Sequence, residues 1–338
     1  MAQRRMRARE LGLELGGSEP GPLDAITDVA GVRVGQTTVR DGDGIRTGVT
    51  AIVPDQVDRA GGQLPAGLFV GNGYGKLIGA TQLAELGVIE TPVLLTGTLS
   101  AFRAADALVT YMLGRPGNAS MTSVNPVVGE TNDGYLSDIR ARPVTERHVL
   151  AAISGARGGP VAEGSVGAGT GTAALGFKAG IGTASRVVRL AGVEPCTIGA
   201  VVQSNFSGTL TVRGVRIAAP DRAAPEPAGN SCMIVAAIDH GLDSRQLSRV
   251  ARRAVFAMGR TGADFAGTSG DYAIAFATRA SAPVADSALG PVFAAVQDAV
   301  EEAILNSLFM ATTTTGYLGH VRRAVPLDNV IRARLTGS

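Results

Sequence analysis

The sequence predicts an α/β protein that folds as one large unit, and three observations support this. The chain has 338 residues and is 45% hydrophobic, which is enough apolar surface for an extensive core. Short strand-like runs bounded by Gly, Pro and Asp alternate with longer stretches in which apolar residues recur three and four positions apart. The charged fraction is 18%, below the average of about 25%, so we also expect a homo-oligomer that covers part of the surface.

The first two thirds of the chain combine several strands with two helices. The helices are expected over 76–86 and 100–113, because apolar residues share one face and the glycines Gly87 and Gly114 follow. Turn residues separate the strands. The expected strands are, in order, 31–35, 49–53, 93–95, 198–203 and 210–213.

The last third reads as strand, helix, strand, helix after a proline-rich linker at 219–230. Asp243, with Gln246 three residues later, is a capping signal for the first of these helices. That helix has one apolar face and arginines around the other, as expected of a helix lying on a sheet. The four expected elements are 231–238, 244–258, 272–278 and 291–312.

Charge and composition exclude several kinds of partner. Net charge is +2, without a basic stripe, so nucleic acid is not an expected partner. No apolar run reaches about 18 residues, so no membrane span is expected. The arginines at 4, 5, 7 and 9 are not followed by an apolar leader, and we expect a cytoplasmic protein. Cys196 and Cys232 are too few for a disulfide framework or a four-cysteine zinc site, and a buried inert thiol is expected at Cys232.

Neither of two glycine-rich loops matches a nucleotide-binding motif. Residues 71–76 have the wrong spacing and no hydroxyl after the lysine, and residues 167–171 lie in a longer glycine-rich stretch. The histidines His148, His240 and His320 have no metal-type spacing and are interpreted as surface or loop residues. A Ser-His-Asp triad stays possible, although no G-x-S-x-G elbow is present. No metal or cofactor is therefore expected.

Ser231 is the outstanding candidate for chemistry. It ends the linker P-D-R-A-A-P-E-P-A-G-N-S and opens the apolar run 232–238. If the Asn230–Ser231 bond were cut, Ser231 would carry a hydroxyl nucleophile and an α-amine able to act as its base. An α-amine has a pKa of about 7.7–8.0, close enough to neutral to accept the hydroxyl proton.

Three polar clusters occur in otherwise apolar surroundings, at 129–136, 203–205 and 267–272. The second directly follows an expected strand and the third directly precedes one, and strand ends often hold catalytic groups. Asn-Asp-Gly and Ser-Gly-Asp are also ordinary turn sequences. Their joint presence with Ser231 favours a site.

Taken together, these segments resemble the self-processing peptidases of the L-aminopeptidase/D-esterase and β-aminopeptidase group. The likeness spans nearly the whole chain. It is carried by residues 24–32, 129–134, 163–171, 178–186, 203–206, 229–235 and 269–271.

The resemblance implies an αββα sandwich similar to that of the N-terminal nucleophile hydrolases and of the ornithine acetyltransferases. It also implies self-cleavage before Ser231 into fragments 1–230 and 231–338, which stay together, and tetramers of such units. Substrates would be small peptides, amides or esters with a free amino group.

The resemblance also assigns roles to individual residues. Asn205 and Tyr135 match the oxyanion donors, which is chemically sensible because neither needs a charge to donate. Ser269 and Asp271 would orient the Ser231 amine and pass protons. Glu130 would bind the substrate ammonium.

Two segments depart from the family pattern and affect the expected pocket. Leu-Thr-Gly-Thr at 95–98 replaces Leu-Thr-Asn-Thr, and Asn-Phe-Ser-Gly at 205–208 replaces Asn-Phe-Gly. Preference among L-α, D and β residues stays open. Two rivals also stay open: an acyltransferase of the ornithine acetyltransferase type, whose nucleophile is threonine, and an unprocessed, non-catalytic oligomer.

Overall fold

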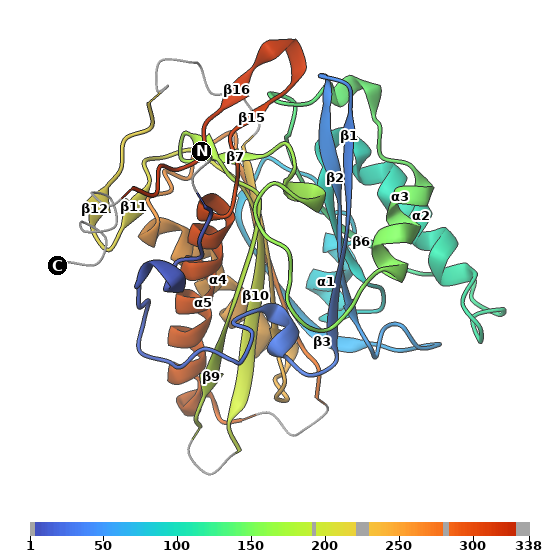
Figure 1. The fold of residues 1–338 in the computed structure, drawn as a ribbon. Coiled ribbons are helices and arrows are strands. Elements are labelled where there is room, and N and C mark those ends of the chain that lie inside the picture. The colour runs from blue at the N-terminus through green and yellow to red at the C-terminus, as the bar shows by residue number, and fades with distance from the viewer. Residues whose placement is uncertain (1–3, 191–193, 221–229, 280–283, 329–338) are drawn as a thin grey trace.

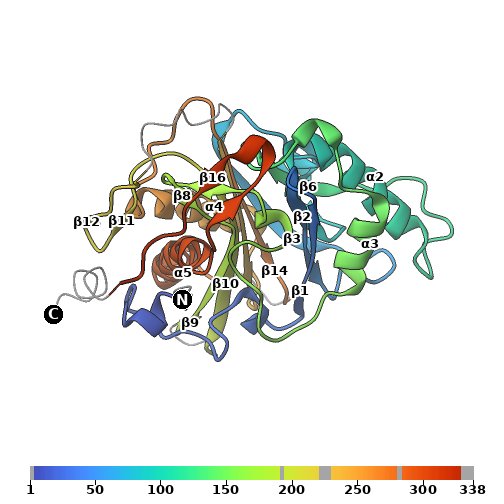
Figure 2. The same cartoon turned by 45° about the horizontal axis from the view of Figure 1, so that its top comes forward.

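Two β-sheets lie face to face and a pair of helices covers the outside of each, so the layers run α, β, β, α (Figure 1). The structure is a computed structural model that describes residues 4–190, 194–220, 230–279 and 284–328. Figure 2 shows the order of the layers, with α5 seen along its axis on one side and α2 and α3 on the other. The predicted sandwich is confirmed.

The smaller sheet has four strands in the order β1-β2-β5-β6. Its strands β5 and β6 are parallel and are joined through α2. Helices α2 and α3 pack on its outer face. The bounds are β1 Val32–Asp41, β2 Ile45–Pro54, β5 Val93–Gly97, β6 Val127–Thr131, α2 Ala101–Leu113 and α3 Glu146–Ser154.

The larger sheet has six strands in the order β4-β3-β14-β13-β10-β9. The central strands β13 and β14 are parallel and are joined through α4. Helices α4 and α5 cover its outer face. The bounds are β3 Leu64–Gly73, β4 Val88–Ile89, β9 Ile181–Val188, β10 Cys196–Asn205, β13 Ser231–Ile238, α4 Ser244–Arg260, β14 Gly270–Ala277 and α5 Gly290–Phe309.

Shorter elements connect these layers. Helix α1 precedes β4, and three two-stranded hairpins lie outside the two main sheets. Their bounds are α1 Ala80–Leu86, β7 Ala173–Ala174, β8 Phe177–Lys178, β11 Thr211–Val212, β12 Val215–Arg216, β15 Thr314–Thr315 and β16 Val321–Arg322. No helix among the described residues is long and apolar enough to cross a bilayer.

Buried apolar side chains form three clusters that correspond to the three contacts between layers. One cluster lies between the two sheets and includes Ile52, Met233 and Ile274. The other two fill the spaces between each sheet and its helices. Burial of apolar surface at these three contacts between layers is the main stabilising contribution to this fold.

Most predicted elements are present, and α4 has the predicted cap, in which Asp243 accepts from the Gln246 amide at 2.7 Å. Helix α1 is shorter than predicted and begins only at Ala80. Residues before it turn toward β6 instead, because Ile78 pairs with Val128 and the Lys76 amide donates to Glu130. Tertiary pairing thus overrides the helical pattern over 76–79.

Other boundaries also differ from the predictions. Helix α5 ends at Phe309 rather than at 312, and the following threonines enter the β15–β16 hairpin. The strand predicted at 210–213 is only the two-residue β11. Strands β1 and β2 extend well beyond the predicted runs, because they pair over ten positions as one long hairpin. Of the predicted linker, residues 221–229 lie outside the described residues.

The arginines near the N-terminus hold the chain start against α5. Arg5 donates to the main-chain carbonyls of Phe309, at 2.6 Å, and Val325, at 2.8 Å. Arg7 forms an ion pair with Glu163 at 2.8 Å. These contacts assign a structural role to the arginine-rich segment, for which the sequence predicted none.

Candidate active site

Ser231 is the first residue of β13 and lies between two partner strands. It is paired with Asn205 at the end of β10 and with Gly270 at the start of β14. Only 2% of the residue is exposed. The predicted nucleophile is therefore fixed in the centre of the larger sheet, at the edge where three strands begin or end.

The carbonyl group of Asn230 receives two hydrogen bonds. The Ser231 hydroxyl donates to its oxygen at 2.6 Å, and the main-chain N–H of Gly270 donates at 2.9 Å. Donation to a carbonyl oxygen polarises the C=O bond and stabilises negative charge that develops on the oxygen. The bond before Ser231 therefore has an adjacent nucleophile and a main-chain donor.

Ser269 and Asp271 flank Gly270 and are hydrogen-bonded to each other. The Ser269 hydroxyl donates to Asp271 Oδ1 at 2.8 Å, and the Asn72 amide donates to Oδ2 at 3.2 Å. Burial raises the pKa of Asp271, and these two bonds partly oppose the rise. The pair predicted from the Ser-Gly-Asp sequence thus lies directly beside the strand position of Ser231.

Asn205 is oriented by the first residue of β7. Its side-chain oxygen accepts from the Ala173 main-chain N–H at 3.0 Å. The side-chain NH₂ of Asn205 is therefore the end that faces away from this strand. Asn205 is cross-strand partner to Ser231, so its predicted role as a donor agrees with its position.

Glu130 lies on β6 in the opposite sheet and is 2% exposed. Its carboxylate accepts from the Lys76 amide at 2.7 Å and from the Thr98 hydroxyl. A Cβ placed on Gly75 would lie 3.3 Å from Glu130 Oε1 and 3.2 Å from Gly270 Cα. Bare glycine backbone therefore separates Glu130 from the start of β14.

Tyr135 is joined to a different part of the chain. Its ring stacks on His320 and carries Arg322 over it, both from the β15–β16 segment. Among the described residues, these ring contacts do not link Tyr135 to Ser231. The structure thus brings Ser231, Asn205, Ser269 and Asp271 together and sets Tyr135 against the hairpin.

Several residues that support the site were not predicted individually. Thr98 donates to Glu130, Asn72 donates to Asp271, and the Tyr272 hydroxyl donates to the Gly75 carbonyl at 3.1 Å. Thr98 lies in the 95–98 segment that was expected to affect the pocket. Tyr272 directly follows the Ser-Gly-Asp turn, and this adjacency was the one signal available for it.

Two further ionisable side chains are buried: Lys178 on β8 and Asp133 just after β6. Burial lowers the pKa of Lys178 to about 7 and raises that of Asp133 to about 7. Lys178 Nζ donates to the Gly169 carbonyl at 3.0 Å.

The predicted buried thiol of Cys232 is confirmed, and burial raises its pKa well above the usual value.

An αββα sandwich with a buried serine at the first position of a central strand is the arrangement of an N-terminal-nucleophile-type hydrolase. The comparison with known families agrees. The model of Peptidase family S58 matches residues 24–322, and the chain belongs to this family. The resemblance found in the sequence is thereby confirmed, and the protein is a hydrolase.

Individual relatives agree with this assignment. The chain is 38% identical to the beta-peptidyl aminopeptidase BapA of Sphingosinicella xenopeptidilytica, over 96% of this chain and 90% of that protein. It superposes with a TM-score of 0.90 on the PH0078 protein of Pyrococcus horikoshii, at 42% identity and 97% and 99% coverage. The TM-score is 0.89 for the L-aminopeptidase D-Ala-esterase/amidase of Ochrobactrum anthropi, at 36% identity and 98% and 99% coverage. That enzyme is described as a variant of the Ntn hydrolase fold.

Proposed function

We propose that the chain cleaves itself between Asn230 and Ser231 and then works as an aminopeptidase with Ser231 as its nucleophile. The observation that carries the proposal is the contact of the Ser231 hydroxyl with the Asn230 carbonyl oxygen at 2.6 Å, beside the Gly270 donor. Family membership supports the peptidase class. The roles proposed for the individual residues are those that the resemblance to this family implies.

In the self-cleavage step, Ser231 Oγ attacks the carbonyl carbon of Asn230. The hydroxyl proton moves to the amide nitrogen, the C–N bond breaks, and an ester joins Asn230 to the serine oxygen. The Gly270 N–H stabilises the intermediate oxyanion. Water then hydrolyses the ester, leaving a carboxylate on Asn230 and a free amine on Ser231.

In the peptidase reaction, the new amine accepts the hydroxyl proton while Oγ attacks the substrate carbonyl. Asn205 and Tyr135 donate to the oxyanion, and Ser269 with Asp271 orients the amine. The leaving amine takes the proton, and water later releases the acyl group. Glu130 pairs with the substrate ammonium and so limits the enzyme to N-terminal residues.

The substrates proposed are small peptides, amides or esters with a free amino group. The Sphingosinicella relative is named for β-peptides and the Ochrobactrum relative for L-amino acids and a D-Ala ester or amide. Kinetics with matched L-α-, D- and β-aminoacyl amides would rank the three classes.

The proposal is tested first by intact mass under denaturing conditions. Dividing 34.3 kDa in the ratio of 230 to 108 residues predicts fragments of about 23 and 11 kDa. Wild type and the neighbouring control Cys232→Ala should show both fragments, and Ser231→Ala should show neither. An uncut wild-type chain without amidase activity would favour the non-catalytic oligomer. Products formed with an added amine would reveal acyl transfer.

We also infer a homo-oligomer, in keeping with the low charge of the chain. Three large apolar side chains are exposed on and beside α2: Leu99 at 42%, Phe102 at 64% and Leu113 at 50%. Such a group favours an interface with another copy. Light scattering of wild type and Phe102→Glu would test it, with a lower mass expected for the variant. The cytoplasmic location remains a prediction.

A further inference from the structure

The ring of Tyr135 has a close contact with each of two residues from the end of the chain. The His320 ring lies 4.4 Å away between centroids and is inclined by only 7°. The Arg322 guanidinium carbon lies 4.1 Å from the centre of the same ring. A parallel imidazole at that distance covers one face of the phenol and leaves the other face for the guanidinium.

The local backbone explains how one short segment reaches both faces. His320 and Arg322 are two positions apart in extended chain, so their side chains point to the same side at a spacing of about 7 Å. A flat ring inserted between them contacts both. His320 Nδ1 also lies 2.8 Å from the Tyr135 carbonyl oxygen, and since that oxygen only accepts, Nδ1 donates.

The burial of Arg322 is the second observation. The residue is only 4% exposed, and its Nε has no hydrogen-bond partner among the described residues. In the part of the chain that the structure describes, no carboxylate forms an ion pair with it. A buried cation without an anion is costly, and the electron-rich face of Tyr135 is the compensating contact that the structure shows.

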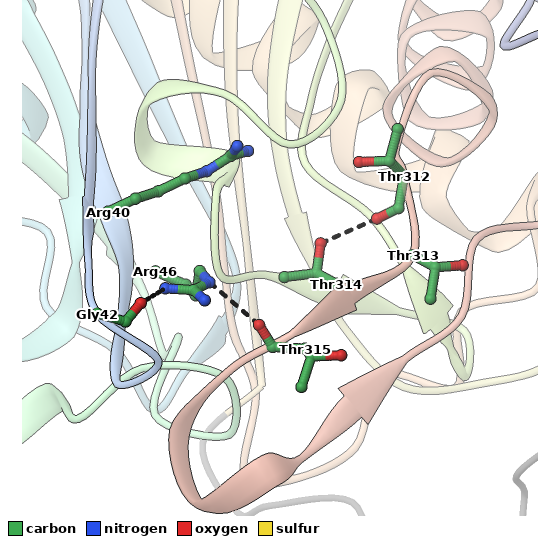
Figure 3. Close-up of a pocket in the computed structure, with 7 residues that line it drawn as sticks. All are labelled: Arg40, Gly42, Arg46, Thr312, Thr313, Thr314 and Thr315. Carbon is green, nitrogen blue, oxygen red and sulfur yellow. Dashed lines mark hydrogen bonds between the residues drawn. The ribbon is translucent and has the colours of Figure 1, made fainter. Parts of the chain in front are cut away.

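The hairpin that carries these two residues is fixed to its surroundings. The Tyr317 N–H donates to the Leu136 carbonyl at 2.9 Å, directly after Tyr135, and the Lys178 N–H donates to the Arg323 carbonyl at 2.7 Å. Arg46 Nε donates to the Thr315 carbonyl at 3.1 Å, across a cavity of about 310 Å³ (Figure 3). We call His320 and Arg322, which pack on the Tyr135 ring, the clamp. Its hairpin is therefore also held in place by the β1–β2 hairpin.

We propose that Arg322 and His320 are positioning residues that fix the Tyr135 ring, so that its hydroxyl points in one direction toward the oxyanion. The inference rests on the proposed role of Tyr135 in Ser231 chemistry. The two faces of the ring fix its plane, and the cation on one face favours negative charge near the phenol oxygen. Both residues would act through Tyr135 rather than on the substrate itself.

The clamp also joins the two proposed fragments at the site. Tyr135 lies before the Asn230–Ser231 bond, and both clamp residues lie after it. After cleavage, the C-terminal fragment would supply both the nucleophile and the groups that orient this oxyanion donor. Docking of the β15–β16 hairpin is thereby part of forming the active site.

The test is a double-mutant cycle on kcat with an aminoacyl p-nitroanilide. Arg322→Met should lower kcat about 3- to 30-fold with little change in KM. In a Tyr135→Phe background, where the ring remains but the hydroxyl is absent, Arg322→Met should have no further effect on kcat. The matched control is Arg253→Met. Arg253 on α4 lies 4.0 Å from the centre of the Phe293 ring on α5, and its loss should leave kcat unchanged.

Each alternative outcome is informative. An equal fall of kcat in both backgrounds would overturn the inference, since Arg322 would then act independently of the Tyr135 hydroxyl. Full activity of Tyr135→Phe would also overturn it, and Ser231→Ala would show separately whether the proposed function itself fails. If Arg322→Met does not fold, His320→Ala has the same expected pattern, and His320→Phe should recover most of kcat by restoring the stack.

Discussion

Arg186 Nη2 and Glu302 Oε2 lie 2.6 Å apart, and both side chains are completely buried. Arg186 is on β9 and Glu302 is on α5, so the ion pair joins the parts of the chain that precede and follow the proposed cleavage site. Arg9 lies 3.2 Å from the same carboxylate. Without Arg186, the buried Glu302 charge would keep only the more exposed Arg9 as a partner, and loss of one side of a buried ion pair is strongly destabilising.

We therefore predict that Arg186→Met lowers the free energy of unfolding by about 3–5 kcal/mol. Urea denaturation of the wild type, of Arg186→Met and of the control variant Arg245→Met measures the change in unfolding free energy. Arg245 also pairs with a carboxylate, Asp286 at 2.8 Å, but on the surface, and its loss should change stability little. Equal effects of the two substitutions would contradict the prediction.

The glycine at position 270 gives a second prediction. A Cβ there would lie 3.2 Å from Ser231 Oγ and 2.7 Å from Gly75 Cα. Gly270→Ala should therefore displace the start of β14 and slow both cleavage and turnover, by about 10²-fold or more if the main-chain donor to Asn230 is lost. Gly267→Ala is the control, because no atom lies within 4 Å of its added methyl. Normal processing of Gly270→Ala would rule out this crowding.

Glu130 gives a third prediction. Glu130→Gln keeps the shape of the side chain but removes its charge, so pairing with a substrate ammonium is lost. The KM for substrates with a free amine should rise about 30-fold or more, because loss of a buried charge partner costs about 2 kcal/mol or more. Steady-state kinetics measures the rise, with the exposed Glu85→Gln as control. An unchanged KM would remove Glu130 from substrate binding.

Asp133 gives a prediction about pH. Burial raises its pKa from 3.8 to about 7. Between these values the unfolded chain releases the proton while the folded protein keeps it, so the stability contributed by this group falls as pH rises. Relative to Asp133→Asn, the unfolding free energy of the wild type should decline from about pH 4 to 7 and be level below this range. Denaturation of both proteins at several pH values would show it, and a constant difference would refute it.

The sequence predicted the elements around Ser231 well because strong local signals mark them. The apolar run at 231–238 became β13 without a change of bounds, and the Asp243 cap fixed the start of α4. The resemblance supplied the layers and the site residues. Local signals failed at 76–79, where pairing with β6 replaced a helical turn, and at 310–312, where the chain leaves α5 for a hairpin.

The supporting contacts of the site depend on approaches across long sequence separations, so they were beyond the reach of local patterns. His320 was interpreted as a surface or loop residue, yet it stacks on Tyr135, 185 positions away. Arg322 carried no signal at all, since an arginine side chain is usually solvated. Only the folded chain shows that both residues face one ring.

Ser231 is bonded into the sheet through β10 on one side and β14 on the other, and this affects how a cut before it would behave. A newly made chain end ordinarily frays within its first few residues. All eight residues of β13 have partners on both sides, so this end would stay as rigid as the middle of a strand. Cleavage would thus produce a reactive N-terminus that is already ordered by the sheet. No conformational change of this segment would have to precede the binding of a substrate.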